Sequence, residues 1–288
     1  MTGFTQFRSS RRIDTQGQVK YMNIKQDFNW VGNEESFVDQ PSTVELGTIC
    51  IGRYGGSSSA GQYKNEDGCF ILTDPEQDWE FLILLDAHTS AESAEMIVET
   101  FRQQKDKIRN LLSLSINEAF RSLEHFTLNL FQSEDFLEAC QRINGETACL
   151  IVSRKGKYCW WFSVGDCLFY LHHPELASLG QYQVNQRHFF EWIGQVNTFN
   201  QAVPCFSIGT KELRKGVNHL IMTTDGLVEC PGEPYIDPKA IFNEFSHSSN
   251  KNGVRKLLKR IQDNNVRDST TIVSWMVAIE EEATIPSE

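Results

Sequence analysis

Short apolar runs alternate with polar turns along most of this chain. The runs CFILTD and WEFLILLD, over residues 69–86, are separated by turn-forming residues and predict an antiparallel hairpin of buried strands. The segment TACLIVSRKGKYCWWFSVGD, over residues 147–166, predicts a second hairpin that turns at Arg154–Lys157. Further strands are predicted at 47–55, 168–173, 219–226 and 270–279.

Two stretches have helical periodicity instead. Thr89 and Glu92 stand at the spacing of a capping box, so we expect a helix to begin there and to run to about Leu112. A second helix is expected from about Ser115 to Cys140, because its apolar residues fall on one stripe. Two shorter helical patterns lie within residues 238–264.

This order of elements is typical of an α+β domain in which antiparallel sheets pack against helices. It lacks the regular strand–helix alternation of a dinucleotide-binding fold, and neither a GxGxxG loop nor a GxxxxGK[ST] motif is present. Residues 173–218 are less regular and rich in polar and aromatic residues, so they are expected to leave the sheet as a long excursion.

Composition and charge narrow the functional classes. The chain has 288 residues, of which 40% are hydrophobic, which is enough apolar material for a sizeable core. Its net charge of -11 argues against binding to nucleic acid or to anionic membranes but is compatible with cations. No apolar run is long enough to span a membrane, and the first twelve residues do not resemble a signal peptide. The eight cysteines form no CxxC pair and are expected to be reduced core thiols of a cytoplasmic protein.

Aspartates stand beside three of the predicted strands. Asp86 ends LILLD, Asp225 ends LIMTTD, and Asp268 precedes the last strand. Converging, partly desolvated carboxylates repel one another unless cations lie between them, and divalent metals with oxygen ligands relieve that repulsion. The alternative for Asp225 is a simple turn role, since Asp-Gly is a common turn dipeptide.

On these residues the sequence resembles the 2C-type, metal-dependent protein serine/threonine phosphatases, including bacterial members. That family carries an Arg-x-x-x-Glu-Asp element, a strand ending in Asp-Gly-His, a Gly-[Ser/Thr]-Thr-Ala strand start, and then Val-Gly-Asp-Ser-Arg, Thr-Asp-Gly and Asp-Asn-x-Thr elements. Similar elements occur here in the same order, across residues 47–279. They are Asn65–Gly68, Asp86–His88, Gly145–Ala148, Val164–Cys167, Thr224–Leu227 and Asp268–Thr271.

The resemblance implies a fold and a metal centre. The expected fold is a four-layer α-β-β-α sandwich of two antiparallel sheets flanked by helix pairs. Two divalent cations, Mn²⁺ or Mg²⁺, are expected at one end of it, with Asp86 bridging both and the backbone carbonyl of Ala87 binding one. Asp225 and Asp268 complete the second cation site in this reading. Residues 46–282 would form the phosphatase domain, with an N-terminal extension over 1–45 and a tail over 283–288.

The resemblance also implies roles in the reaction. Glu66 and Asp67 would orient metal-bound waters, and His88 would act as the general acid that protonates the departing serine or threonine oxygen. Such chemistry is physically sound, because two cations about 3.5–4 Å apart lower the pKa of a water between them. A histidine can then supply the proton. The alternative for His88 is a solvent-facing residue at a helix start.

Several positions depart from the family pattern. The arginine that holds the substrate phosphate falls at Gln62, which cannot form a charge-assisted fork. Lys64 is a candidate substitute for it, as is Arg53. Ala87 replaces a glycine, and Ser269 replaces an asparagine. Other glycines are replaced by Thr89 and Ser90, Ser-Arg is replaced by Cys167–Leu168, and Asn144 falls where some members have an acid for a third metal.

Three functions therefore remain open. The leading prediction is an enzyme that hydrolyses phosphoserine and phosphothreonine on proteins, with a phosphoprotein of a kinase signalling pathway as substrate, and that works as a monomer. The second is a weakly active or non-catalytic regulatory protein, which the loss of arginine at Gln62 favours. The third is a hydrolase of small phosphate esters. The aromatic segment Gln186–Asn200 is expected either to form a substrate-contacting flap or to cover the sheet as core; its aromatic residues are Phe189, Phe190, Trp192 and Phe199.

Overall fold

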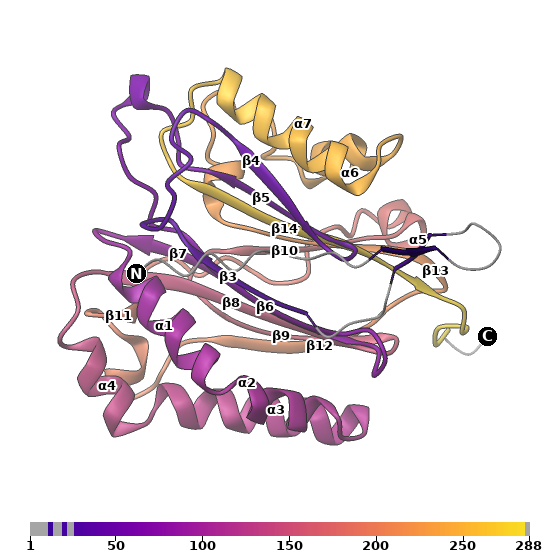
Figure 1. Ribbon diagram of the computed structural model, residues 1–288, viewed down its shortest axis with the longest axis horizontal. Coiled ribbons are helices and arrows are strands. Elements are labelled where there is room, and N and C mark those ends of the chain that lie inside the picture. The colour runs from indigo at the N-terminus through magenta and orange to yellow at the C-terminus, as the bar shows by residue number, and fades with distance from the viewer. Residues whose placement is uncertain (1–10, 14–18, 22–25, 286–288) are drawn as a thin grey trace.

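Two antiparallel sheets lie face to face and carry helices on their outer faces (Figure 1). The computed structural model describes residues 11–13, 19–21 and 26–285. Helices α1 to α4 run along the outside of one sheet, and α6 and α7 cover the other. The α+β sandwich predicted from the sequence is confirmed.

The larger sheet follows the order β12-β9-β8-β7-β6-β3, with the short β11 paired to β8. Its core is the pair of hairpins predicted from the apolar runs, since β6 pairs with β7 and β8 with β9. The strands of this sheet are β3 (Gln26–Val31), β6 (Gly68–Asp74), β7 (Trp79–His88), β8 (Glu146–Lys155), β9 (Tyr158–Val164), β11 (Ile193–Gly194) and β12 (Ser207–Glu212).

The smaller sheet follows the order β10-β13-β14-β5-β4. Each of its neighbouring pairs is antiparallel, so strands far apart in the sequence run side by side. Its strands are β4 (Ser42–Leu46), β5 (Ile49–Tyr54), β10 (Leu168–His172), β13 (Gly216–Thr223) and β14 (Thr270–Ile279), and a separate pair is formed by β1 (Arg11–Ile13) and β2 (Val19–Tyr21).

Both long helices predicted from periodicity are interrupted. The first breaks at Gln104, and the second breaks before Ser133, whose hydroxyl accepts a hydrogen bond from the amide of Phe136 and so caps a new helix. The helices are α1 (Glu92–Gln103), α2 (Lys105–Leu112), α3 (Ile116–Phe131), α4 (Glu134–Cys140), α5 (Pro174–Ser178), α6 (Pro238–Phe245) and α7 (Asn250–Asp263).

The predicted capping box is wrong. Helix α1 starts only at Glu92, and Thr89 lies outside it with a φ of 74°, a left-handed conformation that is rare for a β-branched residue. The hydroxyl of Ser90 instead accepts a hydrogen bond from the Glu92 amide at 3.2 Å and donates one to the carbonyl of Asn144. Thr89 and Ser90 therefore belong to the turn that follows β7.

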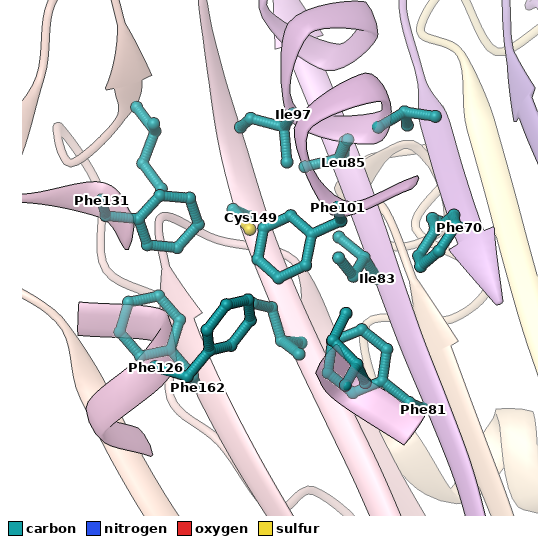
Figure 2. Close-up of a cluster of buried hydrophobic side chains, with 14 of the residues drawn as sticks. Phe70, Phe81, Ile83, Leu85, Ile97, Phe101, Phe126, Phe131, Cys149 and Phe162 are labelled. Atoms are coloured by element: carbon teal, nitrogen blue, oxygen red, sulfur yellow. The ribbon is translucent and has the colours of Figure 1, made fainter. Parts of the chain in front are cut away.

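Three apolar clusters fill the spaces between the layers. One lies between the two sheets, one under α6 and α7, and one under α1 to α4. Figure 2 shows the last of these, where Phe101 of α1 points into a group of rings from the helices and strands. Its ring centroid lies 6.0 Å from that of Phe81 and 5.8 Å from that of Phe131. The packing of these large rings fixes the helices against the sheet.

Residues 26–46 belong to the sandwich. They supply β3 and β4, one edge strand for each sheet. The predicted boundary at residue 45 falls inside β4, because the pairing of β4 with β5 continues to Leu46. Residues 1–10, where the predicted extension begins, lie outside the described part of the chain, and a separate extension stays a prediction.

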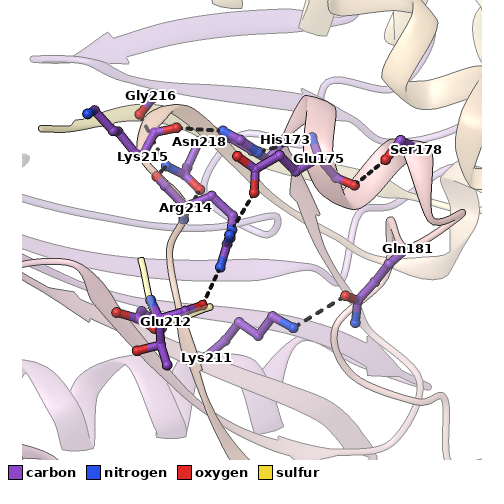
Figure 3. A network of polar contacts seen from close by, with 11 residues as sticks. His173, Glu175, Ser178, Gln181, Lys211, Glu212, Arg214, Lys215, Gly216 and Asn218 are labelled. Carbon is purple, nitrogen blue, oxygen red and sulfur yellow. Dashed lines mark hydrogen bonds and ion pairs between the residues drawn. The ribbon is translucent and has the colours of Figure 1, made fainter. Parts of the chain in front are cut away.

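The excursion over residues 173–218 returns to the sheets at several points. It contains α5, β11, a single 3₁₀ turn at Thr198–Asn200, and β12. At the far end of the sandwich, a network of polar contacts joins α5 to the turn between β12 and β13 (Figure 3). There Arg214 donates to Glu175 at 2.7 Å, and the ring of His173 lies 2.9 Å from the Lys215 carbonyl.

Most of the cysteine side chains lie in the core. Seven of the eight cysteines are buried, Cys205 is exposed, and none forms a disulfide. Among the helices of the described residues, none has the length and apolar character needed to cross a membrane.

Candidate metal centre

Five chain segments meet at one end of the sandwich. The strand register brings the end of β7 beside the start of β6, and it brings Val164, the last residue of β9, opposite Cys149 near the start of β8. In the other sheet, the end of β13 lies beside the start of β14. Side chains that follow or precede these strands are therefore gathered at one place, although the sequence separates them widely.

Asp86 and Asp225 meet across the two sheets. Asp86 lies in β7 opposite Ala148, and Asp225 follows β13 and opens the 3₁₀ turn Asp225–Leu227. The backbone amide of Asp225 donates to Oδ2 of Asp86 at 3.4 Å. Asp225 is therefore not the apex of a simple hairpin turn, which was the alternative reading of its Asp-Gly sequence.

Glycines allow the turns that carry these acids. A Cβ on Gly226 would lie 2.3 Å from the carbonyl oxygen of Ser269, so the turn after β13 can press directly on the segment before β14. Gly165 has a φ of 85°, and a Cβ there would lie 2.5 Å from that of Ala148. Only glycine fits this turn, and it places the next residue, Asp166, beside Asp86 and Asp225.

Three carboxylates form a group that could hold a cation. Oxygen atoms of Asp86, Asp166 and Asp225 all lie within 4.8 Å of one another. Oδ1 of Asp225 is buried and accepts no hydrogen bond. Burial and the neighbouring carboxylates raise the pKa of Asp225 to about 8 and that of Asp86 well above its usual range. Crowded, under-coordinated carboxylate oxygens fit a hard divalent cation, which would supply the missing positive charge.

Asp268 lies at the edge of this group. It is not among the three carboxylates that come within 4.8 Å of one another. Burial raises the pKa of the Asp268 carboxyl, whereas the nearby His88 lowers it. Asp268 is also the charged neighbour with the largest effect on Asp225. Asp268 also raises the pKa of Asp86, so it lies close enough to affect both of these carboxyls.

Asp67 is enclosed by hydroxyl groups. Its Oδ1 accepts from Ser269 at 2.7 Å, and its Oδ2 accepts from Thr271 at 2.7 Å and from Thr224 at 3.2 Å. Burial raises the pKa of Asp67 to about 7, although these hydrogen bonds oppose the rise. With both oxygens engaged, Asp67 joins the start of β6 to the end of β13 and the start of β14. Its predicted role in orienting water stays a prediction.

Lys64 and Glu66 lie beside the turn after β7. Nζ of Lys64 is 2.7 Å from Oε1 of Glu66 and donates to the Thr89 carbonyl at 2.7 Å. This contact places an exposed ammonium next to His88. Gln62 is half-buried, and its Oε1 accepts from the Tyr63 amide at 3.3 Å.

The guanidinium of Arg53, the other candidate substitute for the family arginine, is engaged by neighbouring side chains. It is buried against aromatic rings, with its guanidinium carbon 4.2 Å from the centroid of Phe37 and 5.1 Å from that of Trp30. Its guanidinium donates to the hydroxyl of Ser42 at 3.4 Å. These contacts hold Arg53 at the edge of the smaller sheet, and its role as a phosphate ligand stays a prediction.

The backbone at Ala87 tolerates its side chain. Ala87 pairs with Thr147 within β7 and does not have a positive φ, so replacement of a glycine causes no strain there. The next turn is different, because Thr89 takes the left-handed conformation that a glycine adopts without cost. His88, the last residue of β7, lies between these two positions and is half-buried.

Arg187 is the site residue that sequence reasoning missed. Its Nη2 lies 3.1 Å from Oδ2 of Asp225 and 3.4 Å from Oδ2 of Asp166, and it also pairs with Glu229. Asp166 was seen only as part of a family element and was not proposed as a ligand. No motif distinguishes Arg187, since it lies in the irregular segment after β10.

The aromatic segment around Arg187 divides into two parts. Phe199 is buried and stacks on Phe131 and Phe162, as the core interpretation predicts. Phe189 and Phe190 are 56% and 82% exposed, so the first part of the segment presents rings to solvent beside the acidic group. The rings that a substrate could contact are therefore next to Arg187, and the core rings come later.

Comparison with known proteins supports the fold. No protein-family profile and no curated protein matches the sequence. An arginine-to-glutamate variant of a bacterial serine phosphatase superposes with a TM-score of 0.55 at 14% identity, covering 88% of this chain and 98% of that chain. A second crystal structure of a bacterial serine phosphatase gives 0.54 at 12% identity, with 89% and 98% covered.

PppA, described as a key regulatory component of T6SS in Pseudomonas aeruginosa, gives a TM-score of 0.51 at 14% identity, with 88% and 97% covered. These similarities extend over nearly the whole of each chain. The protein has the fold of the bacterial serine phosphatases, and the resemblance to the 2C-type phosphatases is confirmed in that fold.

Proposed function

We propose that this protein is a metal-dependent phosphatase that removes phosphate from serine and threonine residues of proteins. The observation that carries the proposal is the group formed by Asp86, Asp166 and Asp225 at one end of a serine-phosphatase fold. A divalent cation is the ligand that best relieves such a group of buried carboxylates.

The metal ligands follow from the group and from the family resemblance together. Asp86 and Asp225 belong to both, the Ala87 carbonyl and Asp268 come from the resemblance, and Asp166 comes from the geometry. Two Mn²⁺ or Mg²⁺ ions, when bound there, would activate a water molecule and neutralise the phosphoryl oxygens. The protein's own part is to hold these oxygens in place through strands and tight turns.

We assign His88 as the proton donor to the departing serine or threonine oxygen. It ends β7 two residues after Asp86, is half-buried, and interacts with Asp268, a carboxylate that can orient its ring. Lys64 would contact the substrate beside His88, because its ammonium is held at the Thr89 carbonyl. Glu66 and Asp67 would support the waters of the centre, and Gln62 would contribute a neutral hydrogen bond to the phosphate.

The physiological setting belongs to the same proposal. We expect a phosphoprotein of a kinase signalling pathway as substrate, a monomeric enzyme and a cytoplasmic location. The regulatory alternative is favoured by one specific feature, the neutral Gln62 in place of arginine.

The test is hydrolysis of a phosphoserine peptide with added Mn²⁺, compared with small metabolite phosphates and with an EDTA-treated sample. The proposal predicts Mn²⁺-dependent release of phosphate and a preference for the peptide. Release from the small esters alone would favour a metabolite phosphatase. Mn²⁺ binding without release from any substrate, an aryl phosphate included, would favour the regulatory protein.

A further inference from the structure

One arginine side chain occupies a position among the acids of the candidate metal centre. Nη2 of Arg187 faces Asp166, Asp225 and Glu229 at once, with the shortest contact to Glu229. Among the residues that the structure describes, no other lysine or arginine pairs with Asp166 or Asp225. The side chain of Arg187 is only 18% exposed, so this is a partly desolvated ion pair and not a solvent-exposed one.

The backbone on both sides of Arg187 is fixed to the turn that carries Asp166. The amide of His188 donates to the Gly165 carbonyl at 3.0 Å. The buried side chain of Asn185 accepts from the Phe169 amide at 2.7 Å and donates to the Cys167 carbonyl at 2.8 Å. These hydrogen bonds fix the backbone on both sides of Arg187. Little further conformational entropy is therefore lost when its guanidinium is held beside the carboxylates.

An aromatic ring covers the guanidinium on its outer side. The guanidinium carbon of Arg187 lies 4.7 Å from the centroid of Phe189, which is within the range of a cation–π contact. The Arg187 guanidinium is therefore held both by carboxylates and by an aromatic ring.

We propose that Arg187 is a built-in cation that excludes a divalent metal ion from the face formed by Asp166, Asp225 and Glu229. This inference rests on the proposed function, since it concerns how many cations the same centre accepts. The oxygens that face Nη2 are Oδ2 of Asp166, Oδ2 of Asp225 and Oε1 of Glu229, and a further divalent ion on that side would be repelled strongly by the guanidinium at so short a range. Oδ1 of Asp225 and the carboxylate of Asp86 make no contact with Arg187 and stay available to the cations of the proposed function. The guanidinium stays charged at every accessible pH, so the exclusion is permanent.

Removal of this charge should open the face. In Arg187→Gln the three carboxylates lose their counter-ion, and a divalent cation becomes the remaining way to neutralise them. We expect the variant to bind one more Mn²⁺ or Mg²⁺ per chain than the wild type, or to bind its weakest ion at least about tenfold more tightly. Arg187→Lys keeps a positive charge and should remain close to the wild type.

The experiment is calorimetric titration of the full, metal-free chain with Mn²⁺ and then with Mg²⁺. The matched control is Arg214→Gln, which changes the net charge equally at a side chain that is 22% exposed and pairs with Glu175 in the polar network of Figure 3. The control should give the wild-type isotherm. An Arg187→Gln isotherm equal to that of the wild type, in a folded protein, would overturn the inference.

A second measurement covers a variant that is too unstable for calorimetry. Without metal, Arg187→Gln should unfold at a lower temperature than the wild type, because the repulsion between its carboxylates is uncompensated. Rising Mn²⁺ should then raise its melting temperature by more than it raises that of the wild type. An equal rise in both proteins contradicts the inference.

The two proposals can fail separately. If the wild type hydrolyses no phosphoester and binds no metal, the proposed function is lost, but gain of Mn²⁺ binding in Arg187→Gln would still support exclusion by Arg187. If the wild type is an active Mn²⁺-dependent enzyme and Arg187→Gln binds Mn²⁺ with the same stoichiometry and affinity as the wild type, only the inference about Arg187 fails.

Discussion

The hydroxyl of Ser269 lies 2.7 Å from Oδ1 of Asp67, although 202 residues separate the two in the sequence. The contact joins the segment before β14, in the smaller sheet, to the segment before β6, in the larger one. The contact is buried, and the hydroxyls of Thr271 and Thr224 donate hydrogen bonds to the other oxygen of the same carboxylate. Asp67 therefore links the two sheets, close enough to Asp86 for its charge to raise the pKa of that carboxyl.

Loss of this contact should lower stability. Ser269→Ala leaves Oδ1 of Asp67 buried without a donor, and an unsatisfied buried acceptor costs about 1–3 kcal/mol. Urea unfolding of the metal-free protein measures the effect. Ser113→Ala, at an exposed serine that ends α2, is the control and should change the free energy of unfolding by less than about 0.5 kcal/mol. Equal losses in both variants would show that the buried contact has no special weight.

His88 can be tested through the leaving group. In His88→Gln, hydrolysis of a phosphoserine peptide should fall by about 10²–10⁴-fold, because the serine alkoxide needs a proton as it departs. Hydrolysis of an aryl phosphate, whose leaving group is a much weaker base, should fall far less. The exposed His125 supplies the control, His125→Gln, with unchanged rates for both substrates. A uniform loss with both substrates would remove His88 from the role of acid.

Gln62 should affect substrate capture more than chemistry. A Cβ at Gly56 would lie 2.0 Å from the Arg267 carbonyl and 3.0 Å from Cγ of Gln62, so Gln62 lies near the residue before Asp268. Gln62→Arg adds a charge-assisted hydrogen bond of about 1.5–3 kcal/mol to the phosphate. The KM for a phosphopeptide should fall roughly ten- to a hundredfold, while kcat stays within a small factor. A slower enzyme would indicate that another group, such as Lys64, already holds the phosphate.

His172 should make the fold sensitive to acid. Its ring is 3% exposed, neither ring nitrogen has a hydrogen-bond partner, and Phe242 and Tyr182 contact it edge-on. Burial, with a smaller effect of His219, lowers the pKa of His172 to about 3 from 6.5. Between these two pH values the unfolded chain binds the proton and the folded chain does not. Stability is therefore full above about pH 6.5 and falls as the pH drops toward 3.

The variant His172→Phe removes this proton linkage. Unfolding free energies measured from pH 7 to pH 4 should fall less steeply in the variant, by up to about 1.4 kcal/mol per pH unit below pH 6. His125→Gln, at an exposed ring, should keep the wild-type slope. A wild-type slope in His172→Phe would mean that other groups cause the loss of stability in acid.

Much of the fold could be predicted because its signals are local. The strand pairs β6–β7 and β8–β9 are hairpins whose apolar runs and turn residues are contiguous, and the register follows from the turn. Asp86 and Asp225 could be proposed as site residues from an equally local signal, because each follows directly on an apolar run. The broken helices could not be predicted, because periodicity continues across Gln104 and the break is visible only in the structure.

The parts of the site that depend on tertiary contacts were missed. Arg187 reaches Asp225 only because the chain after β10 returns to the turn at Gly165, and no local pattern predicts that path. The surroundings of Arg53 could not be predicted either. The rings of Trp30 and Phe37 that pack on its guanidinium come from a segment that we placed outside the domain.

The role of Asp225 tests the central claim most directly. Asp225→Asn removes one of the three grouped carboxylates, so calorimetric titration should show at least about tenfold weaker Mn²⁺ binding, with loss of Mn²⁺-dependent hydrolysis of a phosphoserine peptide. The matched control is Asp263→Asn, at an exposed aspartate that ends α7, and it should retain both properties. Unchanged Mn²⁺ affinity and hydrolysis in Asp225→Asn would contradict a metal-dependent phosphatase centre at this end of the sandwich.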